Sequence, residues 1–424
     1  MPRLQPDHED GKPARHIIVQ GRFDMRVLRR FILTAAVLMA APQAYAQERP
    51  LRIGVLEDMS GSYADTTGIG SLTGAQMAAA DVGSVLGRKV EIVFIDTVSK
   101  PDVALGAVRR WLDQEGVEMV VGHGSSAVAL AVRSLMSERG KIDIAVSSLT
   151  SDLSGKACSP TSFQWISDTY VLAKTIGAAT VRSGADTYFS VSTDYAFGAA
   201  MIRDGSRFAN EAGGRSVGEV RVPVGTPDYG SFILQAQASR AKAIMVGLAG
   251  QDMVNFVKQA NEFGVTRSGQ KLASFVTYVG EIKALGLAAT QGLLLAEAFY
   301  WDQSDEARAF SQRFFQLQKR MPNSLHAGMY SAVAHYLAAV KAAGTIDGKA
   351  VAAKMRETPV NDFMTANAAI REDGRVLRDF YLFQVKTPEE SKGEWDLMKP
   401  IQKLSGTEAF RPLAESECPL VKKN

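Results

Sequence analysis

Short segments rich in serine and glycine follow several predicted strands of this 424-residue chain. Ser125 and Ser126 come after a Gly-His-Gly turn at the predicted start of a helix, and Ser148 and Thr150 follow the next predicted strand. The free backbone N–H groups of a helix start attract an anion, glycine permits close approach, and a hydroxyl adds a donor. This pattern suits a carboxylate held without an opposing charge. The same residues would also serve as a helix cap and as turn residues, and both interpretations stay open.

Larger side chains follow the predicted strands in the middle of the chain. Aromatic residues at such positions either pack on the apolar body of a ligand or belong to the core. The candidates for ligand contact outside the serine-rich segments are Tyr63, Tyr195, Phe197, Gln251, Thr277 and Tyr278.

The sequence offers little support for catalysis, a metal or a bound cofactor. It contains no Gly-x-x-x-x-Gly-Lys-Ser/Thr phosphate loop, and a dinucleotide fingerprint would need a third glycine at the correct spacing after Gly68 and Gly70. Beyond residue 46 the histidines are His123, His326 and His335, and none has metal-ligand spacing with a cysteine. His123 lies beside the serine pair without a clear acidic partner. We therefore expect a protein that is not an enzyme and holds neither cofactor nor metal.

The first 46 residues have the order of a signal peptide. Three arginines follow Met25, an apolar run covers residues 31–41, and a small-x-small site precedes the Ala46/Gln47 bond. The apolar run is shorter than the roughly 20 residues of a membrane span. We expect cleavage near this bond and export to the periplasm, with either Met1 or Met25 as the true start.

Charge and cysteine content bound the class of the exported part. Of the 48 basic and 45 acidic residues, seven and four lie in residues 1–46, which leaves 41 of each. A net charge of zero gives no electrostatic support for a nucleic-acid partner. Cys158 and Cys418 are the two cysteines. In an exported chain an even count favours one disulfide over two buried thiols.

Strands and helices alternate along the chain in two successive runs. Predicted strands cover residues 51–56, 90–95, 117–121 and 142–146, and then 187–193, 216–222, 243–248, 273–277 and 292–298. Helical spacing occupies the gaps, including residues 127–139, 196–212 and 252–263. Asp168 is placed to cap a helix over 169–182, and residues 307–343 are predicted helical. A last strand, 379–385, precedes a polar tail. This order predicts parallel sheets with helices on both faces.

Several stretches of the sequence resemble one known family. They are Ile53-Gly-Val-Leu with Met59-Ser-Gly, Leu72-Thr-Gly-Ala-Gln-Met, Val121-Gly-His-Gly-Ser-Ser, Asp194-Tyr-Ala-Phe-Gly and Gln259-Ala-Asn-Glu-Phe-Gly. Their order and spacing are similar to periplasmic solute-binding proteins of the leucine/isoleucine/valine type, which serve ATP-binding-cassette (ABC) importers. The resemblance covers about residues 50–424. Gly155-Lys-Ala-Cys-Ser-Pro, Phe299-Tyr-Trp-Asp, His326-Ala-Gly-Met-Tyr-Ser and Phe410-Arg-Pro-Leu-Ala-Glu look like a branch with members that take up aromatic acids.

The resemblance implies an α/β fold of the type I periplasmic binding class. Two doubly wound Rossmann-like lobes would be joined by three crossover strands, and the cleft between them would close on ligand. We expect an N-terminal lobe of residues 51–170 plus 299–376. The C-terminal lobe and tail would comprise residues 171–298 plus 377–424.

The resemblance also implies roles for the serine-rich segments. The family's carboxylate-binding serine falls on Ser126, with Ser125 beside it, and the next contacts fall on Ser148 and Thr150. The acid that holds the ammonium in amino-acid binders has no counterpart at the matching place, although Glu281 stands a few residues on. A family tyrosine is replaced by Ala249.

These departures favour a ligand with a carboxylate and an apolar or aromatic body, because a buried ammonium without an acidic partner is costly. Aromatic acid, branched-chain amino acid and short amide remain open as ligands. We expect a monomer that delivers its ligand to an ABC permease in the inner membrane. A sensing module that passes a bound metabolite to a membrane receptor is the alternative, since its binding physics is the same.

Overall fold

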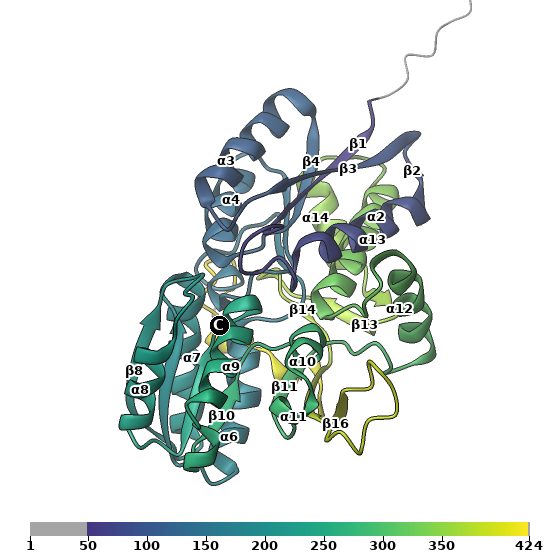
Figure 1. The fold of residues 1–424 in the computed structure, drawn as a ribbon. Helices are drawn as coiled ribbons and strands as arrows, with labels where there is room; N and C mark the ends of the chain where they lie inside the picture. Colours follow the sequence, from purple (N-terminus) through teal and green to yellow (C-terminus); the bar gives the residue numbers. More distant parts are fainter. Residues whose placement is uncertain (1–48, 423–424) are drawn as a thin grey trace, which may run out of the picture. The chain divides into compact units, whose positions relative to one another are not determined.

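The computed structural model describes residues 49–422, so the predicted signal peptide and its cleavage site lie outside the described residues. Strands and helices alternate as the sequence predicted (Figure 1). None of the described helices has the length and apolar character needed to cross a membrane. The strands of the first run are β1 (Leu51–Glu57), β2 (Ser84–Val85), β3 (Arg88–Asp96), β4 (Val117–Gly122), β5 (Ile142–Ala145) and β6 (Ser162–Gln164).

These six strands form one sheet in the order β2-β3-β1-β4-β5-β6. All are parallel to their neighbours except the short β2, which is antiparallel to β3. The carboxyl ends of β1, β4 and β5 therefore meet at one edge of the sheet. In open parallel sheets this edge is where ligands bind.

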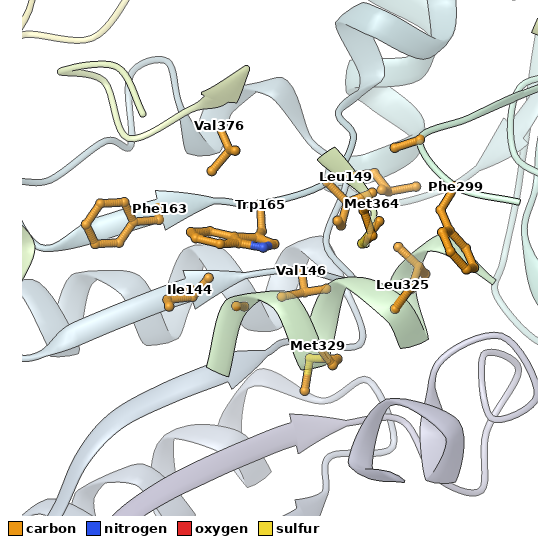
Figure 2. Close-up of a cluster of buried hydrophobic side chains, with 14 of the residues drawn as sticks. Ile144, Val146, Leu149, Phe163, Trp165, Phe299, Leu325, Met329, Met364 and Val376 are labelled. Atoms are coloured by element: carbon orange, nitrogen blue, oxygen red, sulfur yellow. The ribbon is translucent and has the colours of Figure 1, made fainter. Parts of the chain in front are cut away.

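Helices cover both faces of this sheet, as the apolar strands predicted. Val55 and Val121 pack into the same core as α2 (Gly68–Val82), α13 (Ser324–Ala343) and α14 (Gly348–Glu357). Their neighbours Leu56 and Val120 point to the other face, against α3 (Pro101–Arg110) and α4 (Ser126–Glu138). This alternation follows from the two-residue period of a strand. Figure 2 shows Ile144 and Val146 beside Met329 in the first of these cores.

A second parallel sheet contains the strands of the second run, in the order β10-β9-β7-β8. Its strands are β7 (Thr187–Thr193), β8 (Arg215–Val222), β9 (Ala243–Gly247) and β10 (Lys271–Ser274). Its helices include α7 (Ala196–Glu211), α8 (Gly230–Ala238), α9 (Gly250–Glu262) and α10 (Val279–Leu285). The predicted cap at Asp168 is present, since its Oδ1 accepts a hydrogen bond from Val171 N at 2.9 Å. The helix it begins is continuous to Arg182 as α5 (Thr169–Leu172), a π-helical turn (Ala173–Gly177) and α6 (Ala178–Arg182).

The last part of the chain departs from the sequence prediction. The strand expected over 292–298 is β11 (Leu294–Glu297), and it pairs antiparallel with β15 (Phe380–Val385) instead of extending the parallel sheet. The polar tail contains a further strand, β16 (Met398–Leu404), which pairs with β15 and had no hydrophobic alternation to reveal it. The predicted helical stretch divides into α12 (Asp305–Gln318) and α13. A small antiparallel sheet of β12 (Val360–Asp362), β13 (Thr365–Ile370) and β14 (Val376–Leu377) was also missed.

The chain passes between the two parallel sheets three times. It crosses after β6, returns after β11 to place α13 and α14 on the first sheet, and crosses again after β14. A parallel bridge between Gln164 and Arg375 joins the first and third crossings. Arg375 is fully buried there, and its Nη2 lies 2.8 Å from Asp168 Oδ2. This matches the fold class that the sequence indicated.

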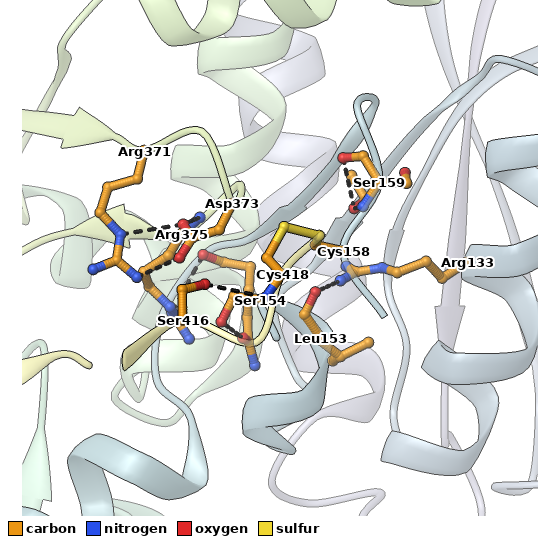
Figure 3. Close-up of a disulfide and its surroundings, with 12 residues drawn as sticks. Arg133, Leu153, Ser154, Cys158, Ser159, Arg371, Asp373, Arg375, Ser416 and Cys418 are labelled. Atoms are coloured by element: carbon orange, nitrogen blue, oxygen red, sulfur yellow. Dashed lines mark hydrogen bonds and ion pairs between the residues drawn. A yellow bond between two sulfur atoms is a disulfide. The ribbon is translucent and has the colours of Figure 1, made fainter. Parts of the chain in front are cut away.

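The predicted disulfide is present. Cys158 and Cys418 are bonded across a sequence separation of 260 residues (Figure 3). The bond ties the end of the chain to the segment that precedes β6. Closing so long a loop removes entropy from the unfolded chain, and the chain-entropy model gives about 5–6 kcal/mol for this effect.

Candidate ligand-binding site

A cavity lies at the carboxyl ends of both parallel sheets. One side, the hydroxyl wall, consists of Thr66, Thr67, Ser125, Ser126 and Ser147, with Gly124 between them. The other side, the aromatic wall, consists of Tyr63, Tyr195, Phe197 and Tyr278. Leu149, Ala249, Val276 and Leu325 complete the lining.

The start of α4 forms the centre of the hydroxyl wall. Ser125 is the N-cap, and its Oγ accepts a hydrogen bond from Val128 N at 3.3 Å. The capping interpretation of Ser125 is therefore realised, while the amides of the first helical residues keep no intrahelical acceptor. Ser126 Oγ accepts from Thr150 N at 3.2 Å, which leaves its own proton for another partner.

The turn that leads into α4 is held in a strained conformation. His123 has a φ of 70°, a left-handed conformation that non-glycine residues rarely adopt. Ser148 Oγ donates to the carbonyl of His123 and, at 2.9 Å, to that of Ser125. Strain of this kind persists where the surroundings hold the backbone in place, and it concentrates at functional sites.

Ser148 and Thr150 therefore act behind the cavity and are absent from its lining. Ser148 braces the turn before α4. The Thr150 side chain accepts from Asp152 N at 3.4 Å and caps a short 3-10 helix. In both cases the turn chemistry considered for these residues is what the structure contains.

His123 corrects one expectation. No acidic partner was evident in the sequence, yet His123 Nε2 lies 2.8 Å from Asp143 Oδ1. Asp143 also pairs with Arg133 Nε at 2.6 Å. Burial would raise the pKa of Asp143, but Arg133 and His123 outweigh it and lower the pKa. Ser125 Oγ is turned to the helix amide rather than to the imidazole, so this is a buried structural network.

The aromatic wall is built by residues at the starts of two helices. Tyr195 is the N-cap residue of α7, Phe197 lies in its first turn, and Tyr278 is the N-cap residue of α10. The Tyr195 and Phe197 rings are 6.0 Å apart. The phenol oxygens of Tyr63 and Tyr195 form a 3.0 Å hydrogen bond, which joins the segment after β1 to the start of α7. Burial raises the pKa of all three tyrosines, so these hydroxyls are neutral at physiological pH.

Gln251 and Thr277 lie outside the cavity lining. Gln251 is exposed, and its side chain donates to Asn255 Oδ1 at 2.8 Å. Its backbone N–H donates to Ser62 O at 2.9 Å. Thr277 Oγ1 is 2.6 Å from Ser274 Oγ.

No acidic or basic side chain lines the cavity within residues 49–422. Glu281 is the nearest acid that the sequence offered. Its Oε1 accepts from Thr66 Oγ1 at 2.6 Å and its Oε2 from Tyr278 N at 3.0 Å. Burial raises the pKa of Glu281. Both of its oxygens are thus used within the protein. No cluster of metal-binding side chains is found in this part of the chain either.

Several lining residues were not among the sequence candidates. Thr66, Thr67 and Leu325 come from a loop and helix ends that no strand-end argument selects. Ser147 lies two residues after the end of β5, and its Oγ donates to Glu57 Oε1 at 2.6 Å. Glu57, an acid inside an apolar strand pattern, was the available signal. Burial raises the pKa of Glu57 to about 8.

Two lobes with a cleft lined by neutral groups define a solute-binding protein. The family model of periplasmic binding proteins matches residues 50–394, and the chain belongs to that family. Its members bind solutes in the periplasm and are not enzymes. The one Gly-x-Ser-x-Gly match, residues 214–218, agrees with this, since Ser216 is exposed within β8 and not at a strand-to-helix turn.

Solved structures support the same assignment. A periplasmic binding protein of Burkholderia mallei is 40% identical, with 88% of this chain and 100% of that chain covered and a TM-score of 0.86. A branched chain amino acid ABC transporter periplasmic ligand-binding protein of Burkholderia xenovorans LB400 is 36% identical, with coverage of 88% and 100% and a TM-score of 0.77. A solute binding protein of an ABC transporter from Rhodopseudomonas palustris HaA2, in complex with p-hydroxybenzoic acid, is similar in fold at 22% identity. There the coverage is 84% and 97%, and the TM-score is 0.76.

Proposed function

We propose that this protein captures a small aromatic carboxylate in the cavity and delivers it to an ABC permease in the inner membrane. The observation that carries the proposal is the division of the cavity into two walls without a charged side chain. The start of α4 with Ser125, Ser126 and Ser147 would hold the carboxylate through neutral donors. Tyr195, Phe197 and Tyr278 would pack on the ring.

An amino acid fits this cavity less well than an aromatic acid. Its ammonium would need an acceptor, and a buried ammonium without one is costly. Glu281 already accepts from Thr66 and from the amide of Tyr278. The similar fold of the protein bound to p-hydroxybenzoic acid supports an aromatic ligand.

Closure of the cleft would complete the site. The proposed lobes, 51–170 plus 299–376 and 171–298 plus 377–424, meet at the cavity through side chains of both. Tyr63 bonds to Tyr195, Thr66 to Glu281, and the Ser62 carbonyl to Gln251 N. A ligand that touches both walls favours the closed form because its contacts are complete only there. We propose that the exported monomer begins near Gln47.

A thermal-shift screen of the exported protein tests this function. The panel contains benzoate, 4-hydroxybenzoate, leucine and benzamide, which has the ring of benzoate but no carboxylate. We expect the aromatic carboxylates to raise Tm, because a ligand that binds only the folded state stabilises it by mass action. A rise in Tm with leucine alone would mean that the ligand is an amino acid and not an aromatic acid. No shift with any carboxylate would contradict the proposed function.

A further inference from the structure

A buried carboxylic acid lies directly behind the hydroxyl wall. Glu57 is the last residue of β1, and its side chain is inaccessible to solvent. Its Oε1 accepts the 2.6 Å hydrogen bond from Ser147, which lines the cavity. A Cβ atom added at Gly124, another lining residue, would lie 3.1 Å from Glu57 Oε2. A single layer of atoms therefore separates this carboxyl from the site proposed for the ligand carboxylate.

Glu57 has no cationic partner within residues 49–422. Burial raises its pKa to about 8, the hydroxyls of Ser147, Thr67 and Ser71 lower it, and the neighbouring Asp58 raises it. Glu57 Oε2 and Ser71 Oγ have no hydrogen-bond partner among the described residues. A buried carboxyl with these surroundings is protonated at neutral pH.

The elements packed around Glu57 bring no compensating positive charge. β3 ends at Asp96, an acid, and α2 presents only hydroxyls. The turn after β4 carries His123, which pairs with Asp143. α13 places His326 against α2 at Gly70, and burial lowers the pKa of His326 to about 3, so this imidazole is neutral.

The protonation of Glu57 decides which way the Ser147 hydroxyl can point. A hydroxyl has one proton to donate. When Glu57 is ionised, Ser147 donates that proton to Glu57 and turns lone pairs toward the cavity. When Glu57 is protonated, it can donate to Ser147 Oγ, and the Ser147 proton becomes free for a ligand carboxylate.

We propose that Glu57 makes ligand capture proton-linked, because only its protonated form turns Ser147 into a donor toward a bound carboxylate and avoids a second negative charge behind the hydroxyl wall. The inference rests on the proposed function, since it requires a carboxylate in the cavity. Above about pH 8, binding takes up one proton from solution, which Glu57 Oε1 or Oε2 accepts. The affinity for a carboxylate then falls by up to about tenfold per pH unit.

Calorimetric titration of the exported protein with benzoate between pH 6 and 9.5 tests the proposal, since benzoate itself stays ionised over this range. Measurement in two buffers of different ionisation enthalpy counts the protons taken up. We expect a constant affinity below about pH 7, a fall above pH 8, and uptake of close to one proton near pH 8.5. Glu57→Gln keeps a donor toward Ser147 without a titrating group. It should bind benzoate with less than a threefold change at pH 7, without the fall and without proton uptake.

Two further variants keep the test decisive. Ser147→Ala removes the donor, so it should bind more weakly at pH 7. Glu297→Gln alters another fully buried acid, whose pKa burial also raises and whose carboxyl oxygens have no hydrogen-bond partner, Ser147 included, within residues 49–422. It should retain the wild-type pH dependence.

Benzoate affinity that is flat with pH in the wild type, or a fall that persists in Glu57→Gln, overturns the proton linkage and leaves the proposed function intact. A Glu57→Gln variant that loses leucine binding would make Glu57 an ionised partner of an ammonium and would also overturn it. Absence of benzoate binding at every pH overturns both.

Discussion

Two strand-to-helix turns contribute to the lining of the cavity, and their chemistry differs. The turn from β4 to α4 is Gly122-His123-Gly124-Ser125, and the turn from β9 to α9 ends in Leu248, Ala249 and Gly250. α4 has a serine N-cap with a side-chain hydrogen bond, whereas α9 begins after Ala249 without one. Both turns lie at the carboxyl end of a central parallel strand, where ligands bind. The same architecture thus carries hydroxyl groups at one turn and none at the other.

Under the proposed function, the hydroxyl wall would select the carboxylate of the ligand and the aromatic wall would select its apolar body. Substitutions in each wall should therefore change different properties of the ligand preference.

Removal of the disulfide should lower stability and leave the difference between the hydroxyl wall and the aromatic wall unchanged. Cys158 and Cys418 lie on neither wall. The double variant Cys158→Ser with Cys418→Ser should lose up to about 5 kcal/mol of unfolding free energy, because the unfolded chain regains the entropy of a very long loop. Chemical denaturation measures the loss. The relative affinities for benzoate and benzamide should not change, and a change would show that the bond shapes the cavity.

Glu57 should contribute its own pH dependence to stability. Its pKa is raised from 4.5 to about 8 in the folded protein, so the folded state binds more protons between these values. The contribution of protonated Glu57 to the free energy of unfolding is fully present below about pH 4.5, and it is lost as the pH rises toward 8. Glu57→Gln should be more stable than wild type at pH 8, on the order of a few kcal/mol, with a smaller difference at pH 5. Equal differences in Tm at both pH values would contradict a raised pKa.

Ser126→Ala tests the hydroxyl wall directly. Hydrogen bonds to charged groups contribute about 1.5–3 kcal/mol, so the affinity for benzoate should fall about 10- to 100-fold. The affinity for benzamide should change less. The matched control, Ala249→Ser, adds a hydroxyl to the opposite turn and should leave benzoate binding nearly unchanged. Equal losses in both variants would mean that the two turns do not differ in role.

Tyr278→Ala tests the aromatic wall. Aromatic pairs contribute about 0.5–1.5 kcal/mol beyond their buried area, so 4-hydroxybenzoate should bind at least about threefold more weakly. A small aliphatic acid should lose much less affinity, because it has no ring to pack on Tyr278 and its carboxylate would contact only the hydroxyl wall. Isothermal titration of both ligands gives the comparison. A uniform loss for aromatic and aliphatic acids would contradict a ring-binding role for Tyr278.

The sequence indicated which serines line the cavity better than it indicated which residues hold the turns behind them. Ser125 and Ser126 follow a strand that hydrophobic pattern identifies, so strand-end reasoning placed them correctly at the cavity. Ser148 and Thr150 satisfy the same rule, yet their hydroxyls turn back onto backbone groups, and only side-chain direction separates them from Ser147. β16 was missed for a related reason, since an edge strand with mostly exposed residues has no apolar alternation. The pairing of His123 with Asp143 depends on the register of β4 and β5, which local sequence does not fix.

A crystal structure of the exported protein with bound benzoate would test the division into two walls most directly. We expect the carboxylate oxygens of benzoate to lie within hydrogen-bond distance of the first amides of α4 and of Ser126 or Ser147. The ring should lie between Tyr195 and Tyr278. A carboxylate directed at the start of α9, with the ring against Ser125 and Ser126, would contradict it.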